Sequence, residues 1–544
     1  MPPKECELMP QSIHVGPSRP KRMSEGTDRP RVAILPEHTK VSSGTEVQEK
    51  LILAARVFSD LLKPTFGPRG LDKMLYKTDG TTAVTNDGAK IVAELLVRHP
   101  AAKMMVSMAE SQEEQCGDGV TTTMLICGSL LIEANNLLRK GIHPLTLVEG
   151  YSLSLEAARA QADADSVEPD AQKISAVSET ALRGKGAESA LNHFSPIIVE
   201  ALETVLQHNG EPRAENVCMF KLGTGSLRDS KLVKGFTFRR RVQLDDLPNN
   251  LKDARIACLD GDLKIRELTR DVELKISNSD HLDSFIDAES ERKDEICQSI
   301  IDSGALAILC SGEIDRDILH HLSDKGILAI GDLDSSEIRN AADSIGARIV
   351  ESTMDIEPDD LGRCGLISWE RRQESDSVED IIRIEGCLGP TVVTIEIGGA
   401  GEAGTEEVIR GLHDSLRATS LAMQESVLPG AGAIHARMAQ AVRDSSDAQG
   451  GRERLAMEAY ARALETIPAT LAENGGGDPL DRVLELRASA RDGSEPIGIS
   501  PEGKAWAVDG VWHPVSVIAN SLESATETAI GMLRIDQVIS SRGD

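Results

Sequence analysis

The order of sequence patterns along the chain is the feature that most restricts its fold. Over the first 165 residues, apolar side chains recur mainly at helical spacing. After residue 235 short β-rich runs alternate with polar helical segments, and after the strand at 391–397 the helical pattern returns. Helical ends around an α/β centre predict a discontinuous domain, with the central part inserted as a module.

Individual elements follow from the same periodicities and from Pro and Gly as boundaries. Helices are predicted over residues 47–62, 89–98, 100–115 and 121–139. The β-rich runs of the centre are Ala254–Leu259, Ala305–Leu309, Gly326–Ile330 and Ala347–Val350. A charged helical stretch, Asp280–Ile301, lies among them.

Composition limits the class of protein. A chain of 544 residues is too long for one hydrophobic core, so two or three domains are expected. Only 2% of the residues are aromatic, so the cores must consist of aliphatic side chains and Ala. The net charge of −29 argues against nucleic acid as a partner, since phosphate backbones attract Lys and Arg. No apolar run of about 18 residues is present, which argues against a membrane partner.

The cysteines and the first residues allow two further expectations. Nine dispersed Cys without a CxxC pair argue against a zinc ribbon or a disulfide framework, and they fit a reducing cytoplasm. Residues 1–30, rich in Pro, Ser, Lys and Arg, are expected to form a disordered tail.

Two short motifs near the beginning of the chain could border a ligand site. In TFGPRGLDKM, residues 65–74, Gly67 and Gly70 bracket a turn that allows close approach to the backbone. In TNDG, residues 85–88, Asp87 could place its carboxylate at the rim of a site. Taken alone, each motif is more typical of an ordinary turn.

The motif GDGVTTT, residues 117–123, has the clearest chemistry. It opens a long predicted helix, and a helix N-terminus offers free N–H groups and a positive dipole that suit phosphate. Asp118 could hold a magnesium ion, which prefers carboxylate and phosphate oxygens. The alternative is helix capping by Asp118.

Two glycine-rich segments occur later in the chain. PGAGA, residues 429–433, again precedes a predicted helix. GGAGEAG, residues 398–404, contains the letters of a dinucleotide-binding fingerprint, but the helix after it leads to another glycine turn and to no second β-run. A Rossmann unit is therefore not expected. GxxxxGK[ST] and HExxH are also absent, which argues against a P-loop and a zincin site.

Taken together, the motifs resemble those of the group II chaperonins, the thermosome family. Besides TFGPRGLDKML, TNDG, GDGVTT and PGAGA, the chain contains HPAAKM, GIHP, LRGKGAE, HDSL, GGDPLD and RIDQVI in the family's order. The match runs from about Val47 to Ile539, and ten motifs in one order are far more specific than any single one.

The resemblance implies a multidomain α and α/β chaperonin fold. A helical equatorial domain would comprise residues 31–171 and 423–544, and a small hinge domain 172–234 and 385–422. An α/β apical domain, 235–384, would carry a helical lid protrusion at about 278–302. The implied function is an ATP-dependent chaperone subunit that binds unfolded proteins and folds them in a closed double ring of like or related subunits.

The resemblance also implies roles for individual residues. Asp118 would bind Mg²⁺, Asp87 and Asp414 would orient and activate the attacking water, and Lys185 would sense the γ-phosphate. The residues expected to contact ATP are Thr65, Gly67, Pro68, Gly119, Thr121, Thr122, Lys185, Gly430, Gly432, Asn474 and Asp478.

Hydrolysis by this set would need the hinge to close over the nucleotide, because Asp414 lies in the hinge and Asp118 does not. Three residues depart from the family's pattern: Val120 replaces a common Thr, Ala431 interrupts three Gly, and His513 stands where an acidic residue normally meets the ribose. The alternative function is a divergent, weakly hydrolysing structural or substrate-selecting subunit of a mixed ring.

Overall fold

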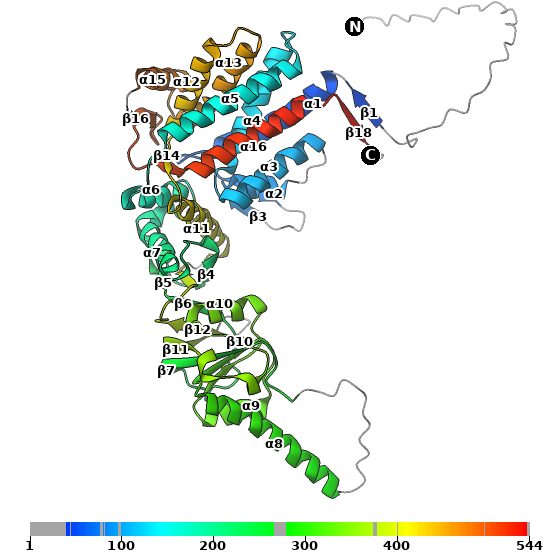
Figure 1. The fold of residues 1–544 in the computed structure, drawn as a ribbon, viewed down its shortest axis with the longest axis vertical. Coiled ribbons are helices and arrows are strands. Elements are labelled where there is room, and N and C mark those ends of the chain that lie inside the picture. Colours follow the sequence, from blue (N-terminus) through cyan, green and yellow to red (C-terminus); the bar gives the residue numbers. More distant parts are fainter. Residues whose placement is uncertain are drawn as a thin grey trace, which may run out of the picture.

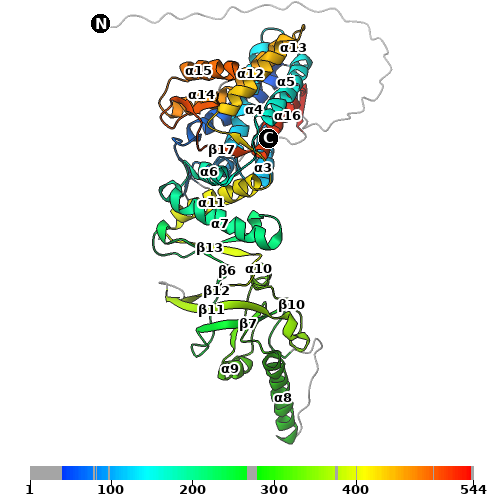
Figure 2. The same ribbon diagram turned by 60° about the vertical axis from the view of Figure 1, so that its left-hand side comes forward.

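The chain forms an elongated molecule of three tiers (Figure 1). The computed structural model describes residues 40–43, 45–76, 80, 82–95, 99–265, 279–373, 378–399, 401–493 and 495–540. The first tier contains both ends of the described chain, and the second and third tiers follow it in a line (Figure 2). The tail predicted for residues 1–30 lies outside the described residues.

The first tier is a bundle of helices drawn from both ends of the sequence. Helix α4 lies inside it and contacts α1, α13 and α16. The helices are α1 Thr45–Leu62, α2 Gly88–Glu94, α3 Pro100–Cys116, α4 Val120–Leu138, α5 Pro144–Asp165, α12 Ala433–Asp447, α13 Glu453–Leu464, α14 Thr466–Asn474, α15 Pro479–Asp492 and α16 Val515–Leu533.

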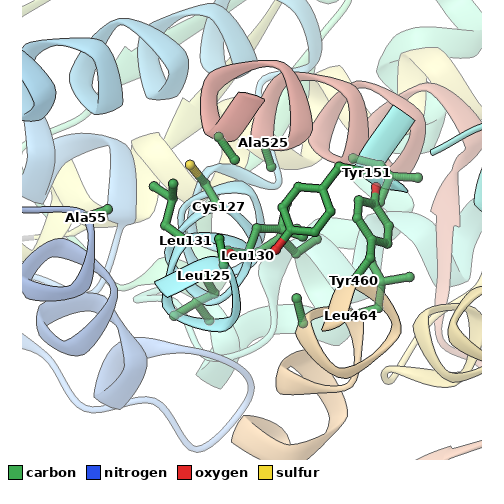
Figure 3. Close-up of a cluster of buried hydrophobic side chains, with 14 of the residues drawn as sticks. Ala55, Leu125, Cys127, Leu130, Leu131, Tyr151, Tyr460, Leu464 and Ala525 are labelled. Carbon is green, nitrogen blue, oxygen red and sulfur yellow. Dashed lines mark hydrogen bonds between the residues drawn. The ribbon is translucent and has the colours of Figure 1, made fainter. Parts of the chain in front are cut away.

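The core of this tier is aliphatic, as the scarcity of aromatic residues predicts. Leu125, Leu130 and Leu131 of α4 are fully buried against other helices of the bundle (Figure 3). Two tyrosines are also buried here, Tyr151 and Tyr460, with their rings edge to face at 5.5 Å. The hydroxyl of Tyr151 donates a hydrogen bond to the carbonyl of Leu130 at 2.7 Å, so this buried hydroxyl has a partner.

Short strand pairs that the sequence patterns did not predict complete the first tier. Each is a two-stranded antiparallel sheet. The pairs are β1 Lys40–Ser43 with β18 Gln537–Ser540, β2 Lys73–Tyr76 with β3 Thr82–Thr85, β14 Val427–Pro429 with β17 Trp512–Pro514, and β15 Ile497–Ile499 with β16 Ala505–Ala507. Two of these pairs, β14–β17 and β15–β16, border the candidate site described below.

The second tier combines a small sheet with three helices, of which α7 lies on the sheet and α6 and α11 pack on α7 and on each other (Figure 2). Its strand order is β4–β13–β5, with β13 parallel to β4 and antiparallel to β5. The elements are α6 Ala171–Leu182, α7 Leu191–Asn209, α11 Glu402–Ala422, β4 Val217–Lys221, β5 Lys231–Val233 and β13 Val393–Ile397. Because β14, which follows α11, pairs with β17 in the first tier and not with β13, the segment 398–404 is not part of a Rossmann unit.

The third tier is the α/β region that the sequence places in the centre. Its sheet has the order β6–β12–β11–β7–β8–β9, with β10 also paired to β7. The strands are β6 Gly235–Arg239, β7 Asn250–Leu259, β8 Ala307–Cys310, β9 Leu328–Ile330, β10 Ile349–Val350, β11 Gly362–Gln373 and β12 Val378–Glu385. The helices are α8 Ser279–Ser303, α9 Arg316–Asp324 and α10 Ser335–Ile345.

The C-terminal part of helix α8 packs in the third tier, whereas the part before it is exposed. Ile296 and Ile300 are buried in the core of the third tier, whereas Ile286 is 53% exposed. The helix extends beyond the sheet at the end of the molecule opposite the first tier (Figure 1). Residue 278, where the predicted protrusion begins, and the side chains of residues 279–285 lie outside the described part.

Most predicted helices agree with the structure to within a few residues, and the exception has a local cause. The helix predicted over 89–98 ends at Glu94, since Leu95 is extended with φ −79° and ψ 119°. His99 is also extended, because the ring of Pro100 disfavours helical backbone in the residue before it. In the part of the chain that the structure describes, no helix meets the length and apolarity needed to cross a membrane.

Candidate functional site

A pocket lies where the first and second tiers meet. It is lined by the predicted motifs at 65–68, 86–88, 117–122, 183–185 and 430–432 and by Asp414. The structure thus brings together these predicted site residues: Thr65, Gly67, Pro68, Asp87, Asp118, Gly119, Thr121, Thr122, Lys185, Asp414, Gly430 and Gly432.

The start of α4 forms one wall of the pocket. Gly119 is its N-cap residue, with φ 88°, a conformation that costs glycine little and other residues more. No side chain caps this helix, and the Asp118 carboxylate accepts a hydrogen bond only from the adjacent N–H of Gly119, at 2.8 Å. The N–H groups of the first turn therefore remain available to an anion, and simple capping by Asp118 does not explain the motif.

The Thr65–Gly70 turn and Asp87 line the same cavity in more ordinary structural roles. Gly67 has φ 84°, and a Cβ there would lie 2.5 Å from Cδ2 of Leu471, so only glycine fits without a shift. Asp87 caps α2, accepting hydrogen bonds from the N–H groups of Ala89 and Lys90. Asp87 therefore both begins a helix and presents a carboxylate to the pocket.

The ammonium group of Lys185 lies close to two carboxylates of the pocket. It forms an ion pair with Asp414 of α11 and lies 3.8 Å from Asp118 of the first tier. We call this part of the pocket, with Asp87, Asp118, Lys185, Asp414 and the start of α4, the charged end. Since Asp118 and Asp414 belong to different tiers, the charged end exists only where the tiers are docked.

Burial and mutual repulsion set the protonation of this cluster. Burial alone would lower the pKa of Lys185, but Asp414 and Asp118 hold it above its ordinary value, so the ammonium stays charged. Burial raises the pKa of Asp414 well above its usual range; the charge of Lys185 opposes this shift, and Asp87, Asp118 and Glu113 add to it. Asp414 is therefore an unusually basic carboxylate, the property a proton acceptor needs.

Glu113 of α3 was not predicted from the sequence, although it lines the pocket. Burial, then the charges of Asp87 and Asp118, raise the pKa of Glu113 to about 7, while Arg417 opposes the shift. Its position in a polar helical stretch, without a motif, gave no signal. An excess of carboxylates with raised pKa values indicates a site that favours a bound cation.

Further contacts hold the second tier against the pocket. The guanidinium of Arg417 donates to the carbonyl of Glu113 at 2.8 Å, and Thr85 donates to the carboxylate of Glu407 at 3.1 Å. The side-chain amide of Asn86 donates to the carbonyl of Gly184. Each contact joins a first-tier residue to a second-tier one, so the two tiers are docked on each other beside the pocket.

Two predicted residues do not line the pocket. The side-chain amide of Asn474 donates to the carbonyls of Lys63 and Phe66, at 2.9 and 2.8 Å, and so supports the 65–70 turn from behind. Asp478 caps α15 by accepting from the N–H groups of Leu480 and Asp481. The structure thus gives Asn474 a supporting contact and Asp478 a capping one.

Another part of the pocket lining, which we call the apolar end, has different chemistry. The turn 430–432 forms its floor, with Ala431 at φ 54° and Gly432 at φ 79°. His435 of α12, Trp506 of β16 and His513 of β17 line it beside aliphatic side chains. Of these three, the sequence had singled out only His513; a lone His on a helix and a Trp in a three-residue strand carry no motif. The apolar lining comprises Ile467, Leu471, Ile499, Pro501 and Val511.

The two ends together fit a nucleotide with a magnesium ion. The N-terminus of α4 and Lys185 suit phosphate, and the apolar end suits a flat, largely apolar group. No group of three or more His, Cys, Asp or Glu that could hold a metal by itself occurs among the described residues. Magnesium is usually held by one or two carboxylates together with phosphate oxygens, and Asp118 at the charged end is a carboxylate of this kind.

Comparison with known proteins identifies the family. The model of the TCP-1/cpn60 chaperonin family matches residues 58–542. The chain belongs to this family. This chaperonin is 36% identical to the thermosome subunit of Methanopyrus kandleri over 95% of its own length and 96% of that protein. It is 36% identical to thermosome subunit alpha of Archaeoglobus fulgidus, over 94% and 95% of the two chains.

A third relative, thermosome subunit alpha of Halobacterium salinarum, is 35% identical over 93% of this chain and 91% of its own. The group II chaperonin fold and chaperone function implied by the resemblance are thereby confirmed, and the divergent structural subunit is not favoured.

Proposed function

We propose that this chaperonin subunit is an ATP hydrolase and that the pocket between its first two tiers is the ATP site. The observation that carries the proposal is the position of Lys185, which contacts Asp414 of the second tier and approaches Asp118 of the first. The catalytic set is then complete only when the tiers close, which ties hydrolysis to domain movement.

Each charged residue has a distinct proposed task. Asp118 holds Mg²⁺, which when bound offsets the charge of the phosphates. The first-turn N–H groups of α4 and the hydroxyls of Thr121 and Thr122 bind phosphate oxygens. Lys185 contributes a positive charge beside the terminal phosphate and keeps Asp414 in place.

Asp414 and Asp87 position the attacking water in this proposal. Asp414 has the raised pKa, so it accepts the proton when the water oxygen attacks phosphorus. Asp87 is fixed by its two hydrogen bonds to the start of α2, and it orients the water with little freedom of its own.

We further propose that the three tiers are the equatorial, intermediate and apical domains. Separate hydrophobic clusters support this division: one spans 47–162 and 428–533, one lies within 182–217 and 393–416, and one within 236–387. The third tier would bind unfolded protein, and α8 would be its lid protrusion.

The proposed assembly is a double ring of identical or related subunits in the cytoplasm. The names of the relatives support it in part, since they are thermosome subunits and Archaeoglobus fulgidus has an alpha and a beta form. The described cysteines are all unpaired, as is usual in a reducing compartment.

Replacement of Asp414 tests the hydrolysis proposal. Asp414→Ala should lower the turnover number by about 10² or more, the scale of losing a positioned general base, while ATP affinity changes little. Steady-state phosphate release and equilibrium ATP binding measure the two effects. Asp163→Ala, an exposed carboxylate of α5 outside the pocket, is the matched control. An unchanged turnover number in Asp414→Ala would refute the assignment.

Limited proteolysis tests the lid. Residues 286–292 are exposed, whereas Lys293 is held by Asp317 at 2.7 Å and by Asp315 at 3.3 Å. Trypsin should therefore cut after Arg292 in the nucleotide-free protein, and far less with ATP and a mimic of the transferred phosphate, when neighbouring protrusions meet. Equal cleavage in both states would favour a helix that stays on its own domain.

A further inference from the structure

A second cavity lies in the second tier, beside the first residues of α7, the helix that Figure 2 shows across this tier. Its lining includes the charged side chains of Arg183, Glu188 and Arg228 and the imidazole of His193. Acidic residues outnumber Lys and Arg by 88 to 59 in the whole chain, so a cavity with two arginines and one acid departs from the composition. None of these four side chains has a task in the hydrolysis proposed above.

The two guanidinium groups of the lining are only weakly neutralised. Arg183 forms one ion pair, with Glu179, at an N–O distance of 3.7 Å. Arg228 is exposed, and its side chain has no ion pair or hydrogen bond with any residue that the structure describes. A guanidinium is always charged and offers five N–H donors in a plane that matches the oxygens of phosphate. Both groups therefore keep charge and donors for an anion.

The backbone that carries the two arginines is held in place. Arg183 directly follows α6, and Arg228 is the middle residue of a tight turn, Leu227–Asp229. The carboxylate of Asp229 closes this turn by accepting from the N–H and the hydroxyl of Ser226, at 2.7 and 3.0 Å. Asp229 is thus engaged locally and is not part of the cavity lining. Only the arginine side chains have to become ordered around a ligand, which limits the entropy lost on binding.

His193 adds a hydrogen-bond acceptor to this positively charged lining. Its Nε2 lies 2.7 Å from the carbonyl oxygen of Ser230, and because a carbonyl only accepts, Nε2 carries the proton. In the neutral ring Nδ1 then has a lone pair, and no residue in the described part of the chain hydrogen-bonds it. The fitting occupant has negative charge and a hydroxyl group. Inorganic phosphate has both at neutral pH, whereas sulfate has the charge without the hydroxyl.

We propose that the second cavity is a binding site for inorganic phosphate, in which Arg183 and Arg228 hold the oxyanion and His193 accepts from its hydroxyl. The site is distinct from the proposed ATP site, although Arg183 lines both cavities. The charge of Glu188 opposes the two arginines, so we expect binding to be readily reversible. Binding here does not require the proposed function, although hydrolysis of ATP would supply the ligand.

Equilibrium dialysis of the full-length protein with radiolabelled inorganic phosphate tests the assignment. A non-hydrolysable ATP analogue and magnesium are kept at saturation, so that the charged end is filled. The parent should bind one further phosphate per subunit, and an equal concentration of sulfate should displace little of it. Arg228→Gln should weaken phosphate binding about tenfold or more, the scale of losing a charge-assisted hydrogen bond, and leave affinity for the analogue unchanged. Arg183→Gln should also weaken phosphate binding.

Arg213→Gln is the matched control, because Arg213 is an exposed arginine of the same tier that pairs with Glu211 and lines neither cavity. It should bind phosphate like the parent. Absence of further phosphate in the parent, or unchanged phosphate binding in Arg228→Gln, would overturn this inference and leave the proposed ATP site intact. Displacement by sulfate as effective as by unlabelled phosphate would also overturn it. A parent that does not bind the analogue would overturn the proposed function instead, and Arg228→Gln compared with Arg213→Gln would still decide the phosphate site.

Discussion

The two ends of the pocket satisfy their polar groups in opposite ways. At the charged end, Lys185 is paired with Asp414 and lies close to Asp118. At the apolar end, one buried nitrogen each of His435 and Trp506 has no partner among the described residues. The difference agrees with energetics, because an unpaired buried charge costs far more free energy than an unpaired neutral N–H.

The two ends should also contribute differently to nucleotide binding, one mainly to its affinity and the other mainly to its selectivity. The charged end offers strong interactions to any polyphosphate, because helix N–H groups and an ammonium do not distinguish one nucleotide from another. The apolar end offers mainly aliphatic and aromatic contacts, which depend on the shape of the group that occupies it. Variants at the two ends should therefore differ in how much they change nucleotide affinity and in which ligands are affected.

The largest effect on nucleotide affinity is expected from Asp118→Ala. Without this carboxylate the charged end loses its proposed magnesium ligand, so ADP affinity in the presence of magnesium should fall on the order of tenfold or more. With chelator present, the same variant should bind ADP no worse than the parent, since one negative charge near the phosphates is gone. Calorimetric titration with and without magnesium measures both. A loss that does not depend on magnesium would break the proposed division between the two ends.

Glu113→Gln tests the electrostatics of the charged end. The pKa of Glu113 is raised to about 7 in the folded protein from 4.5, so the folded state holds the proton more tightly. The stability this contributes is complete below about pH 4.5 and is lost as the pH rises towards 7. Glu113→Gln has no titrating carboxyl at this position, so the variant does not lose this stability as the pH rises. It should stabilise the nucleotide-free protein by about 1–3 kcal/mol at pH 8 and by almost nothing at pH 4.5.

Thermal unfolding of parent and variant across this pH range gives the measurement. Glu114→Gln is the neighbouring control, since Glu114 is exposed and outside the pocket lining. A stability gain in Glu113→Gln that is the same at both pH values would show that repulsion among the carboxylates is not the cause.

The smallest effect is expected at the apolar end, from Ala431→Gly. Ala431 has φ 54°, a left-handed conformation that costs a residue with a Cβ about 1 kcal/mol relative to glycine. Ala431→Gly should therefore stabilise the protein by up to about 1 kcal/mol in denaturant unfolding. Ala433→Gly, at the first residue of α12, should instead destabilise by up to about 1 kcal/mol. Loss of stability in both variants would mean that Ala431 is not strained.

The sequence by itself determined the parts of the protein that depend on local geometry. Glycines in GDGVTTT and PGAGA begin helices with positive φ at Gly119 and Gly432, and Pro100 begins α3, because these preferences belong to the residues and not to their surroundings. The same motifs, in a fixed order, were enough to indicate the family.

Only the tertiary structure decided which groups meet and which remain unpaired. Lys185 and Asp414 are 229 residues apart, and neither sequence position shows that Asp118 lies beside them. His435 and Trp506 carry no motif, and their burial depends on a hairpin that packs against a distant turn. The physical reason is that burial and electrostatics are properties of long-range packing, which places residues by contacts that no local pattern encodes.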